Sequence, residues 1–389
     1  MIDYILNNRK SKVTAIICEM NPPHIGHARL IENAKKFGGT IALIMSGNFV
    51  QRGTPAVFDK LARARAAMAI GADIVLELPA AFSLLSAEGF ARSGVLLANA
   101  IGADTLCFGA ENASVELLEK IAEVSVSPEA EELTAVKLGL GLSYAKARAQ
   151  AISAVFPDAE APLSSPNNLL AIEYIRAIAR ENFDIRPVAF SRTENVSSEE
   201  IRKLLLSGTE LTQLQSVPRT AAAALEGCEP VFLPGLDVAV LSRLRQMQKS
   251  KLLSIRGAGD GIGERVYNAS REAYSLVTLA DTVKDKRHTH SGIRRFILAA
   301  ALEITENIPE SPEYIRPLAS NPRGRELLAE LRNGRLPVLT KPAKVTDLSL
   351  SAQFIMRIES AATDLYNLGL SKPEWRLGGQ EWKTTPIVD

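Results

Sequence analysis

The sequence has little cysteine and little histidine. Its three cysteines, Cys18, Cys107 and Cys228, lie far apart and form no CxxC pair. This pattern argues against disulfides and a structural zinc site, and it is typical of proteins from a reducing cytosol. The four histidines have no metal-ligand spacing to a cluster of carboxylates. We therefore expect no resident metal and name no metal ligands.

Long apolar runs and a net charge are also missing. The first ten residues contain no apolar core of signal-peptide length, and the longest apolar stretches, such as 296–302, are too short to cross a bilayer. The net charge is +1, so any site for a polyanion must be a local patch. We expect a cytoplasmic protein without a membrane partner. At 389 residues the chain has room for two or three domains.

Short apolar segments alternate with helical patterns along the first half of the chain. Residues 13–17, 40–45, 73–78, 104–108 and 185–190 are expected strands with helices between them. This alternation predicts an α/β fold, with a parallel sheet covered by helices on both faces and ligands bound beyond the carboxyl ends of the strands. After Ser207-Gly208 the strand patterns stop. We therefore divide the chain into an α/β domain, 1–208, and a mostly helical region, 209–389, whose tail is either docked or flexible.

A histidine-containing turn follows the first expected strand. Pro22 and Pro23 restrict the backbone before the next helix begins, and Gly26 lets another group lie directly on the main chain. His24 and His27 then share one face of the first helical turn, beside the free N–H groups and the positive end of the helix dipole. This arrangement suits an anion, in particular a triphosphate. The competing interpretation is that the histidines only cap the helix.

These four residues, His-Ile-Gly-His, resemble the HIGH motif of the nucleotidyltransferase superfamily, which includes class I aminoacyl-tRNA synthetases and small-metabolite adenylyltransferases. The strand before the motif and the helix after it supply the context that the motif requires. The fold that this resemblance implies is a Rossmann-like nucleotidyltransferase domain. Nucleotide binding is therefore favoured over capping alone.

A second motif opens the helix after the last expected strand. In Val-Ser-Ser-Glu-Glu-Ile-Arg, residues 196–202, Ser197 or Ser198 caps the helix and a glutamate is placed for a capping box. Capping does not explain Arg202, which lies one turn into the helix and can reach phosphates at its N-terminus. The segment is similar to the ISSTxIR element of the same superfamily. Two such motifs in the right order favour an adenylyl-transfer site.

Two segments of the helical region are locally basic. The first runs from Arg243 to Arg256, and the second from Lys284 through Lys286 and Arg287 to Arg294 and Arg295. Such charges usually lie on a solvated helix face. The functional alternative is a patch that binds the phosphate backbone of RNA. The residues alone leave both interpretations open.

Longer blocks resemble one family, the bacterial tRNA(Met) cytidine acetate ligases. Residues 19–27 resemble the family's EYNPFHNGH, residues 45–56 its MSGxFxQRGxPA, and residues 286–295 its basic block; the segments 77–79, 108–112 and 165–168 match further blocks. Members of the family activate acetate with ATP to acetyl-adenylate and then acetylate N4 of the wobble cytidine of elongator tRNA(Met). The resemblance implies this activity here, with ATP and Mg²⁺ as small-molecule requirements and acetate and elongator tRNA(Met) as partners.

The resemblance and the two motifs together give a set of site residues. We expect His24, His27 and Arg202 to be catalytic, and Lys286, Arg287, Arg294 and Arg295 to bind RNA. The ATP-binding residues that the resemblance implies are Ile17, Cys18, Glu19, Met20, Asn21, Pro22, Pro23, His24, Ile25, Gly26, His27, Ala28, Arg29, Leu30, Gly109, Asn167, Arg192 and Thr193. Two interpretations stay open for Glu19, a substrate or metal contact and a buried structural carboxylate. For Asn167 the alternative is helix capping.

Three functions compete at this point. The first is the RNA-modifying ligase, which transfers acetyl groups to tRNA. The alternative is a small-metabolite adenylyltransferase that uses the same motifs and ignores acetate and tRNA. The third is a nucleotide-sensing RNA-binding protein without turnover. Incubation with ATP, Mg²⁺, labelled acetate and tRNA separates the three.

Overall fold

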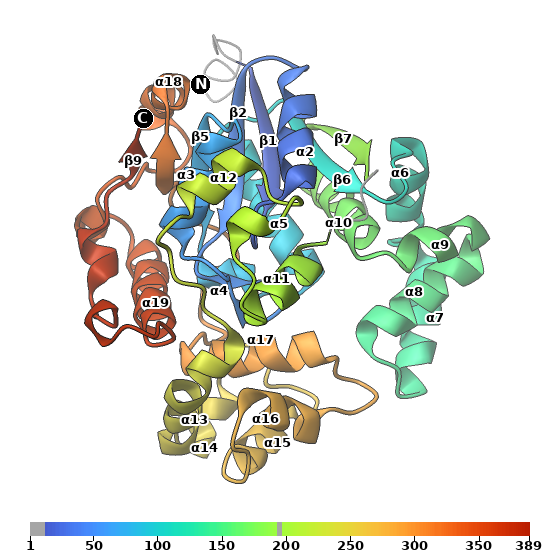
Figure 1. The fold of residues 1–389 in the computed structure, drawn as a ribbon. Coiled ribbons are helices and arrows are strands. Elements are labelled where there is room, and N and C mark those ends of the chain that lie inside the picture. The colour runs from blue at the N-terminus through green and yellow to red at the C-terminus, as the bar shows by residue number, and fades with distance from the viewer. Residues whose placement is uncertain (1–11, 193–196) are drawn as a thin grey trace.

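The computed structural model describes residues 12–192 and 197–389. At its centre is a seven-stranded sheet with the strand order β7-β6-β1-β2-β5-β8-β9 (Figure 1). Neighbouring strands from β7 to β5 are parallel, β8 is antiparallel to β5, and β9 is parallel to β8. The strands are β1 Val13–Cys18, β2 Thr40–Ser46, β5 Ile74–Leu78, β6 Thr105–Ala110, β7 Arg186–Ser191, β8 Pro317–Ser320 and β9 Ile387–Val388, with a separate hairpin of β3 Phe49–Val50 and β4 Thr54–Pro55.

Helices follow the strands along the chain as the sequence predicts. Those of the first half are α2 Ile25–Lys35, α3 Lys60–Ala69, α4 Ala80–Ser83, α5 Ala87–Ala100, α6 Val115–Val124, α7 Pro128–Gly139, α8 Tyr144–Val155, α9 Glu160–Leu163, α10 Pro166–Arg180 and α11 Ser198–Leu206. Those of the second half are α12 Arg219–Ala224, α13 Asp237–Gln246, α14 Lys249–Leu253, α15 Ile262–Ala269, α16 Leu276–Val283, α17 His290–Ala301, α18 Pro322–Glu330 and α19 Leu350–Asn367. The prediction of an α/β fold with a mostly helical second half is confirmed.

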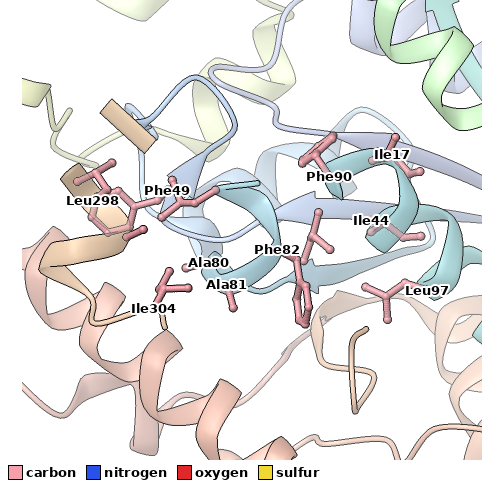
Figure 2. Packing of buried hydrophobic residues seen from close by; sticks show 14 of the residues in the cluster. Ile17, Ile44, Phe49, Ala80, Ala81, Phe82, Phe90, Leu97, Leu298 and Ile304 are labelled. Atoms are coloured by element: carbon pink, nitrogen blue, oxygen red, sulfur yellow. The ribbon is translucent and has the colours of Figure 1, made fainter. Parts of the chain in front are cut away.

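Side chains of one strand serve two different cores because they alternate across the sheet. Ile16 and Cys18 of β1 pack with Ile31 of α2 and Ala67 of α3. On the opposite face, Ile17 packs with residues of α5 and α10, and Figure 2 shows it with Phe90 and Leu97. Both faces are therefore covered, which is why the parallel strands are continuous apolar runs.

The helical region also contributes to the sheet, which the sequence did not indicate. The prediction that strands stop after residue 208 is wrong for β8 and β9, which extend the sheet beyond β5. One apolar core runs through both halves of the chain: in Figure 2, Leu298 and Ile304 lie beside Phe49 and Ala80. Figure 1 shows α13 to α17 gathered below the sheet.

A buried ion cluster connects the C-terminal tail, residues 371–389, to the sheet. The Nζ atom of Lys60 lies 2.5 Å from Oε1 of Glu77, 2.9 Å from Oε1 of Glu359 and 2.8 Å from Oε1 of Glu381. Arg316 contacts Glu77 at 3.4 Å and also pairs with Glu381. All five side chains are almost fully buried. Of the two possibilities for the tail, docking is therefore the correct one.

The sheet reverses its winding direction beside β1. The chain moves outward from β1 to β2 and β5, and then crosses to β6 and β7 on the other side of β1. A crevice is expected at the carboxyl ends of the strands on either side of such a reversal, and this is where doubly wound sheets bind ligands. No helix of the described residues is both long and apolar enough to cross a membrane.

Candidate active site

The histidine turn lies at the carboxyl end of β1, beside that reversal. His24 is the N-cap of α2: its Nδ1 accepts a hydrogen bond from the backbone N–H of Gly26 at 3.1 Å. Nδ1 of His27 accepts one from the backbone N–H of His24 at 3.2 Å, and the ring centroids are 3.9 Å apart. Both histidines therefore cap the helix, and these hydrogen bonds also fix which ring nitrogen carries the proton. Because Nδ1 of each ring accepts, a neutral ring carries its proton on Nε2 and presents an Nε2–H donor.

Burial keeps both histidines neutral. It lowers the pKa of His24 to about 4, and the nearby charge of Arg192 acts in the same direction. The pKa of His27 lies well below its usual range because of burial, His24 and Arg192. At neutral pH the two rings therefore supply directed N–H donors and no charge. Positive charge at this site comes from arginines and from the N-terminus of α2.

Arg192 comes from the far side of the reversal. It follows β7, and its backbone N–H donates to the carbonyl oxygen of Ala110 at 3.1 Å. Gly109, in β6, lies against it: a Cβ at this position would be 3.5 Å from Cγ of Arg192. The structure thus brings the histidine turn, Gly109 and Arg192 together, as the sequence predicts. Thr193 lies outside the described residues.

Asn167 lies in the first turn of α10 and is bound to the loop after β6. Its Nδ2 donates to Oε1 of Glu111 at 2.6 Å, and the backbone N–H of Asn168 donates to the other carboxylate oxygen at 3.2 Å. Oδ1 of Asn168 accepts from the backbone N–H of Asn112 at 3.1 Å. The two asparagine side chains thus bind the β6 loop and not the N–H groups of α10, which is not the capping role considered from the sequence. They fix this loop at the carboxyl edge of the sheet.

Arg202 connects the two motifs. Its Nη1 donates to the carbonyl oxygen of Asn21 at 2.6 Å, immediately before the histidine turn. Ser197 caps α11 by accepting from the backbone N–H of Glu200 at 3.1 Å. The guanidinium of Arg202 is therefore held between the N-termini of α2 and α11. Phosphates placed there meet two helix ends as well as this charge.

Glu19 fixes a neighbouring loop. Its Oε1 accepts from the backbone N–H of Gln51 at 2.9 Å, and burial raises the pKa of the carboxyl group. This contact supports the structural alternative for Glu19.

The role of Arg63 was not predicted from the sequence. Its fully buried guanidinium donates to carbonyl oxygens of Phe58 at 2.8 Å, Glu19 at 2.6 Å and Ser46 at 3.0 Å, and also to that of Gly47. It joins the carboxyl ends of β1 and β2, and its alanine-rich helix gives no signal of this role.

The predicted RNA-binding residues fall into two pairs. Lys286 and Arg287 are exposed in the segment before α17. Arg294 and Arg295 lie on α17 and contact the β3–β4 hairpin, where Nη1 of Arg295 donates to the carbonyl oxygen of Gln51 at 3.1 Å. Burial and the charge of Arg294 lower the pKa of Arg295 to about 10. The second pair therefore also holds the two halves of the chain together.

Comparisons with known proteins show the family to which the chain belongs. The family HIGH Nucleotidyl Transferase matches residues 11–381. The tRNA(Met) cytidine acetate ligase of Acetivibrio thermocellus is 31% identical over 97% of this chain and 100% of its own length. That of Thermotoga maritima is 31% identical over 95% of this chain and 98% of its own. The crystal structure of Thermotoga maritima TmcAL bound with alpha-thio ATP superposes with a TM-score of 0.89, at 30% identity over 97% of this chain and 99% of that one. The chain belongs to the HIGH nucleotidyl transferase family and, within it, to the tRNA(Met) cytidine acetate ligases.

Proposed function

We propose that this protein activates acetate with ATP and transfers the acetyl group to N4 of the wobble cytidine of elongator tRNA(Met). The observation that carries this proposal is the meeting of His24, His27, Arg192 and Arg202 at one carboxyl edge of the sheet. Full-length similarity to proteins named tRNA(Met) cytidine acetate ligase supports the choice of substrate.

ATP would lie across the reversal beside β1, with its phosphates at the N-termini of α2 and α11. We assign its contacts to the segment from Ile17 to Leu30 and to Gly109, Asn167, Arg192 and Thr193. The Nε2–H groups of His24 and His27 would donate to phosphate oxygens, and Arg202 would balance their charge. All three would act most strongly as pyrophosphate leaves.

The first step joins two anions. An acetate oxygen attacks the α-phosphorus of ATP, and the bond to the bridging oxygen breaks, so that acetyl-adenylate and pyrophosphate form. Positioned donors and positive charge suffice for this step, and no covalent enzyme intermediate is needed. In the second step the N4 amine attacks the acetyl carbonyl carbon and AMP leaves. The amine releases one proton to solvent.

Magnesium would arrive with the nucleotide. Among the described residues, no group of three or more His, Cys, Asp and Glu side chains could hold a metal ion. The nearby carboxylate of Glu19 is already engaged by Gln51. Phosphate oxygens and water are the ligands that Mg²⁺ usually keeps in such sites. We therefore propose MgATP as the substrate form.

We also propose a division of labour along the chain. Residues 1–208 would bind ATP and form the adenylate, and residues 209–389 would bind RNA through Lys286, Arg287, Arg294 and Arg295. The free thiols of Cys18, Cys107 and Cys228 support a reducing, cytoplasmic location.

Incubation of the purified protein with ATP, Mg²⁺, ¹⁴C-acetate and bulk tRNA tests the activity. We expect the label in RNA and, after nuclease digestion, in N4-acetylcytidine. Label only in a free metabolite would support a small-metabolite adenylyltransferase instead. ATP and RNA binding without any labelled product would contradict both enzyme activities.

A further inference from the structure

The tip of the β3–β4 hairpin is held from two sides. From the nucleotide site, Glu19 accepts the backbone N–H of Gln51 at 2.9 Å. From the helical region, Arg295 donates to the carbonyl oxygen of Gln51 at 3.1 Å, and Nε of Arg294 donates to that of Arg52 at 3.4 Å. Gly53 has a φ of +71°, and a Cβ there would lie 2.5 Å from the backbone nitrogen of Arg295. The backbone that carries Arg52 is therefore fixed between the two halves of the protein.

The side chain of Arg52 points toward α11, whose N-terminus is one of the two proposed to bind phosphates. Its Nη1 lies 3.3 Å from Oε2 of Glu199, in the first turn of α11, and both side chains are about half exposed. Arg202 follows Glu199 by three residues on the same helix, so the two share one face. Arg52 thus lies at the outer edge of the site formed by Arg202 and the histidine turn.

Among the described residues, fewer carboxylates than cations act at these guanidinium groups. Glu199 is shared between Arg52 and Lys203, whose Nζ lies 3.1 Å from Oε1. Burial lowers the pKa values of both Arg202 and Arg294, and the charge of Arg52 lowers them further, so Arg52 repels each of these two groups. Of the other carboxylates nearby, Glu19 accepts a hydrogen bond from Gln51 and also acts on Arg52 and Arg202, and Asp281 acts on Arg294 from α16. A phosphate bound here would relieve this repulsion, and Arg52 would exchange a weak exposed ion pair for it.

The direction of this positive charge favours RNA over ATP as the source of the phosphate. From Arg202 it continues through Arg52 to Arg294 on α17, and the exposed Lys286 and Arg287 lie in the segment just before this helix. The triphosphate of ATP is served by the N-termini of α2 and α11, whereas Arg52 lies at the outer edge of α11 and its backbone is hydrogen-bonded to Arg294 of the helical region. A strand bound to the basic segment before α17 would therefore pass Arg52 before it reached the nucleotide site.

We propose that Arg52 binds a backbone phosphate of the RNA strand that carries the reactive cytidine, and thereby positions this nucleotide beside the adenylate. The inference rests on the proposed function. Arg52 would act as a positioning residue, because it contacts the backbone of the substrate and not the reacting atoms. Arginine suits this role because its planar fork holds a phosphate in one orientation.

The test compares Arg52→Ala and Arg52→Lys with Lys203→Ala, a matched control that removes another cation paired with Glu199. Three quantities are measured for each: acetate-dependent ATP–pyrophosphate exchange without RNA, acetyl transfer to tRNA, and the salt dependence of tRNA binding. We expect Arg52→Ala to lower kcat/KM for tRNA by about tenfold to a hundredfold, the usual effect of removing a charged hydrogen bond. This reduction should exceed the reduction of exchange at least severalfold. The slope of log K against log salt should flatten by about 0.7, the value for one phosphate of a single strand. Arg52→Lys should recover part of the activity, and Lys203→Ala should resemble the parent.

Each remaining outcome counts against the assignment. An equal loss of exchange and transfer would place Arg52 on the phosphates of ATP. A parent-like slope and transfer rate in Arg52→Ala would remove it from the RNA path. If the parent binds tRNA without acetylating it, the proposed function fails while the salt slope still tests Arg52. A parent that does not bind tRNA overturns both.

Discussion

The histidine turn and the buried ion cluster both gather polar groups near the carboxyl ends of neighbouring strands, but they use them differently. In the ion cluster, Lys60 is surrounded by three carboxylates, and Arg316 pairs with two of them. In the histidine turn the backbone N–H groups occupy only Nδ1 of each ring, and no hydrogen bond joins Nε2 of His24 or His27 to the rest of the described chain. Groups that are satisfied internally stabilise the fold, and groups left with free donors can serve a ligand.

A proton on Glu77 neutralises the net charge of the ion cluster. With Lys60, Arg316 and three carboxylates ionised, the cluster would carry a formal charge of −1. Burial and the charges of Glu359 and Glu381 raise the pKa of Glu77 to about 8, so Glu77 holds a proton at pH 7 and the charge becomes zero. Oε2 of Glu77 makes no hydrogen bond to the described residues and lies 3.4 Å from Nη1 of Arg316. The cluster is therefore balanced without any external ion.

The largest effect should come from breaking this balance. Lys60→Met leaves three buried carboxyl groups without their central cation, so we expect the free energy of unfolding to fall by about 3–5 kcal/mol in urea denaturation. Lys120→Met is the control, because Lys120 belongs to an exposed pair with Glu123 and should change stability by less than about 1 kcal/mol. Equal stability of the two variants would show that the cluster is not structural.

Removal of a histidine should mainly reduce activity, whereas removal of Lys60 should mainly reduce stability. We expect His27→Ala and His24→Ala to reduce acetate-dependent ATP–pyrophosphate exchange by about a hundredfold or more, because each loses a donor to the developing charge. His24→Asn separates the two roles of this residue. Asparagine can still cap α2, so this variant should be more stable than His24→Ala, but its ATP–pyrophosphate exchange should stay as low. Near-normal exchange in both alanine variants would mean that the turn is only structural.

The same contrast distinguishes the two basic segments of the helical region. In the first, Arg243 and Lys251 both pair with Glu303, Lys249 pairs with Glu264, and Arg245 donates to two carbonyl oxygens. In the second, neither Lys286 nor Arg287 has a side-chain ion pair or hydrogen bond within the described part of the chain. Cations that are already paired have little left for RNA.

We therefore expect Lys286→Ala with Arg287→Ala to weaken tRNA binding by about tenfold at physiological salt. The log–log salt slope should flatten by about 0.7 to 1 unit for each RNA phosphate that the variant no longer neutralises, the lower value applying to a single strand. The matched control is Arg243→Ala with Lys249→Ala, which removes two cations from the other segment. Filter binding over a range of salt concentrations measures both pairs. A larger loss of affinity in the control would move the RNA path to residues 243–256.

The smallest effect concerns pH. Because the pKa of Glu77 is higher in the folded protein than the usual value of 4.5, the native state holds a proton that the unfolded chain has lost. The contribution of Glu77 to stability is therefore largest at acidic pH and declines as pH rises toward 8. Glu77→Gln should remove this decline, which we expect to be on the order of 1 kcal/mol between pH 6 and pH 7. Thermal or urea unfolding at both pH values would reveal it, and parallel profiles of parent and variant would contradict it.

Much of the fold and the centre of the site could be predicted from the sequence because they depend on short-range patterns. Apolar runs gave the five parallel strands to within one or two residues, and the spacing of His24 and His27 gave the turn, since one helical turn fixes both. The contributions of β8 and β9 were missed because each is short and needs β5 or β8 as a partner.

Long-range neighbours decided the rest. Lys60 donates a hydrogen bond to Glu359, which is 299 positions away in the sequence. Arg63 donates to the carbonyl oxygen of Glu19, which is 44 positions away. The sequence shows which side chains are charged and could form ion pairs. Only the folded chain determines which ion pairs form, because burial makes an unpaired charge costly. The sequence alone therefore determined the five parallel strands, the histidine turn and the two basic segments. The tertiary structure decided which charges hold the fold together and which remain available to a ligand.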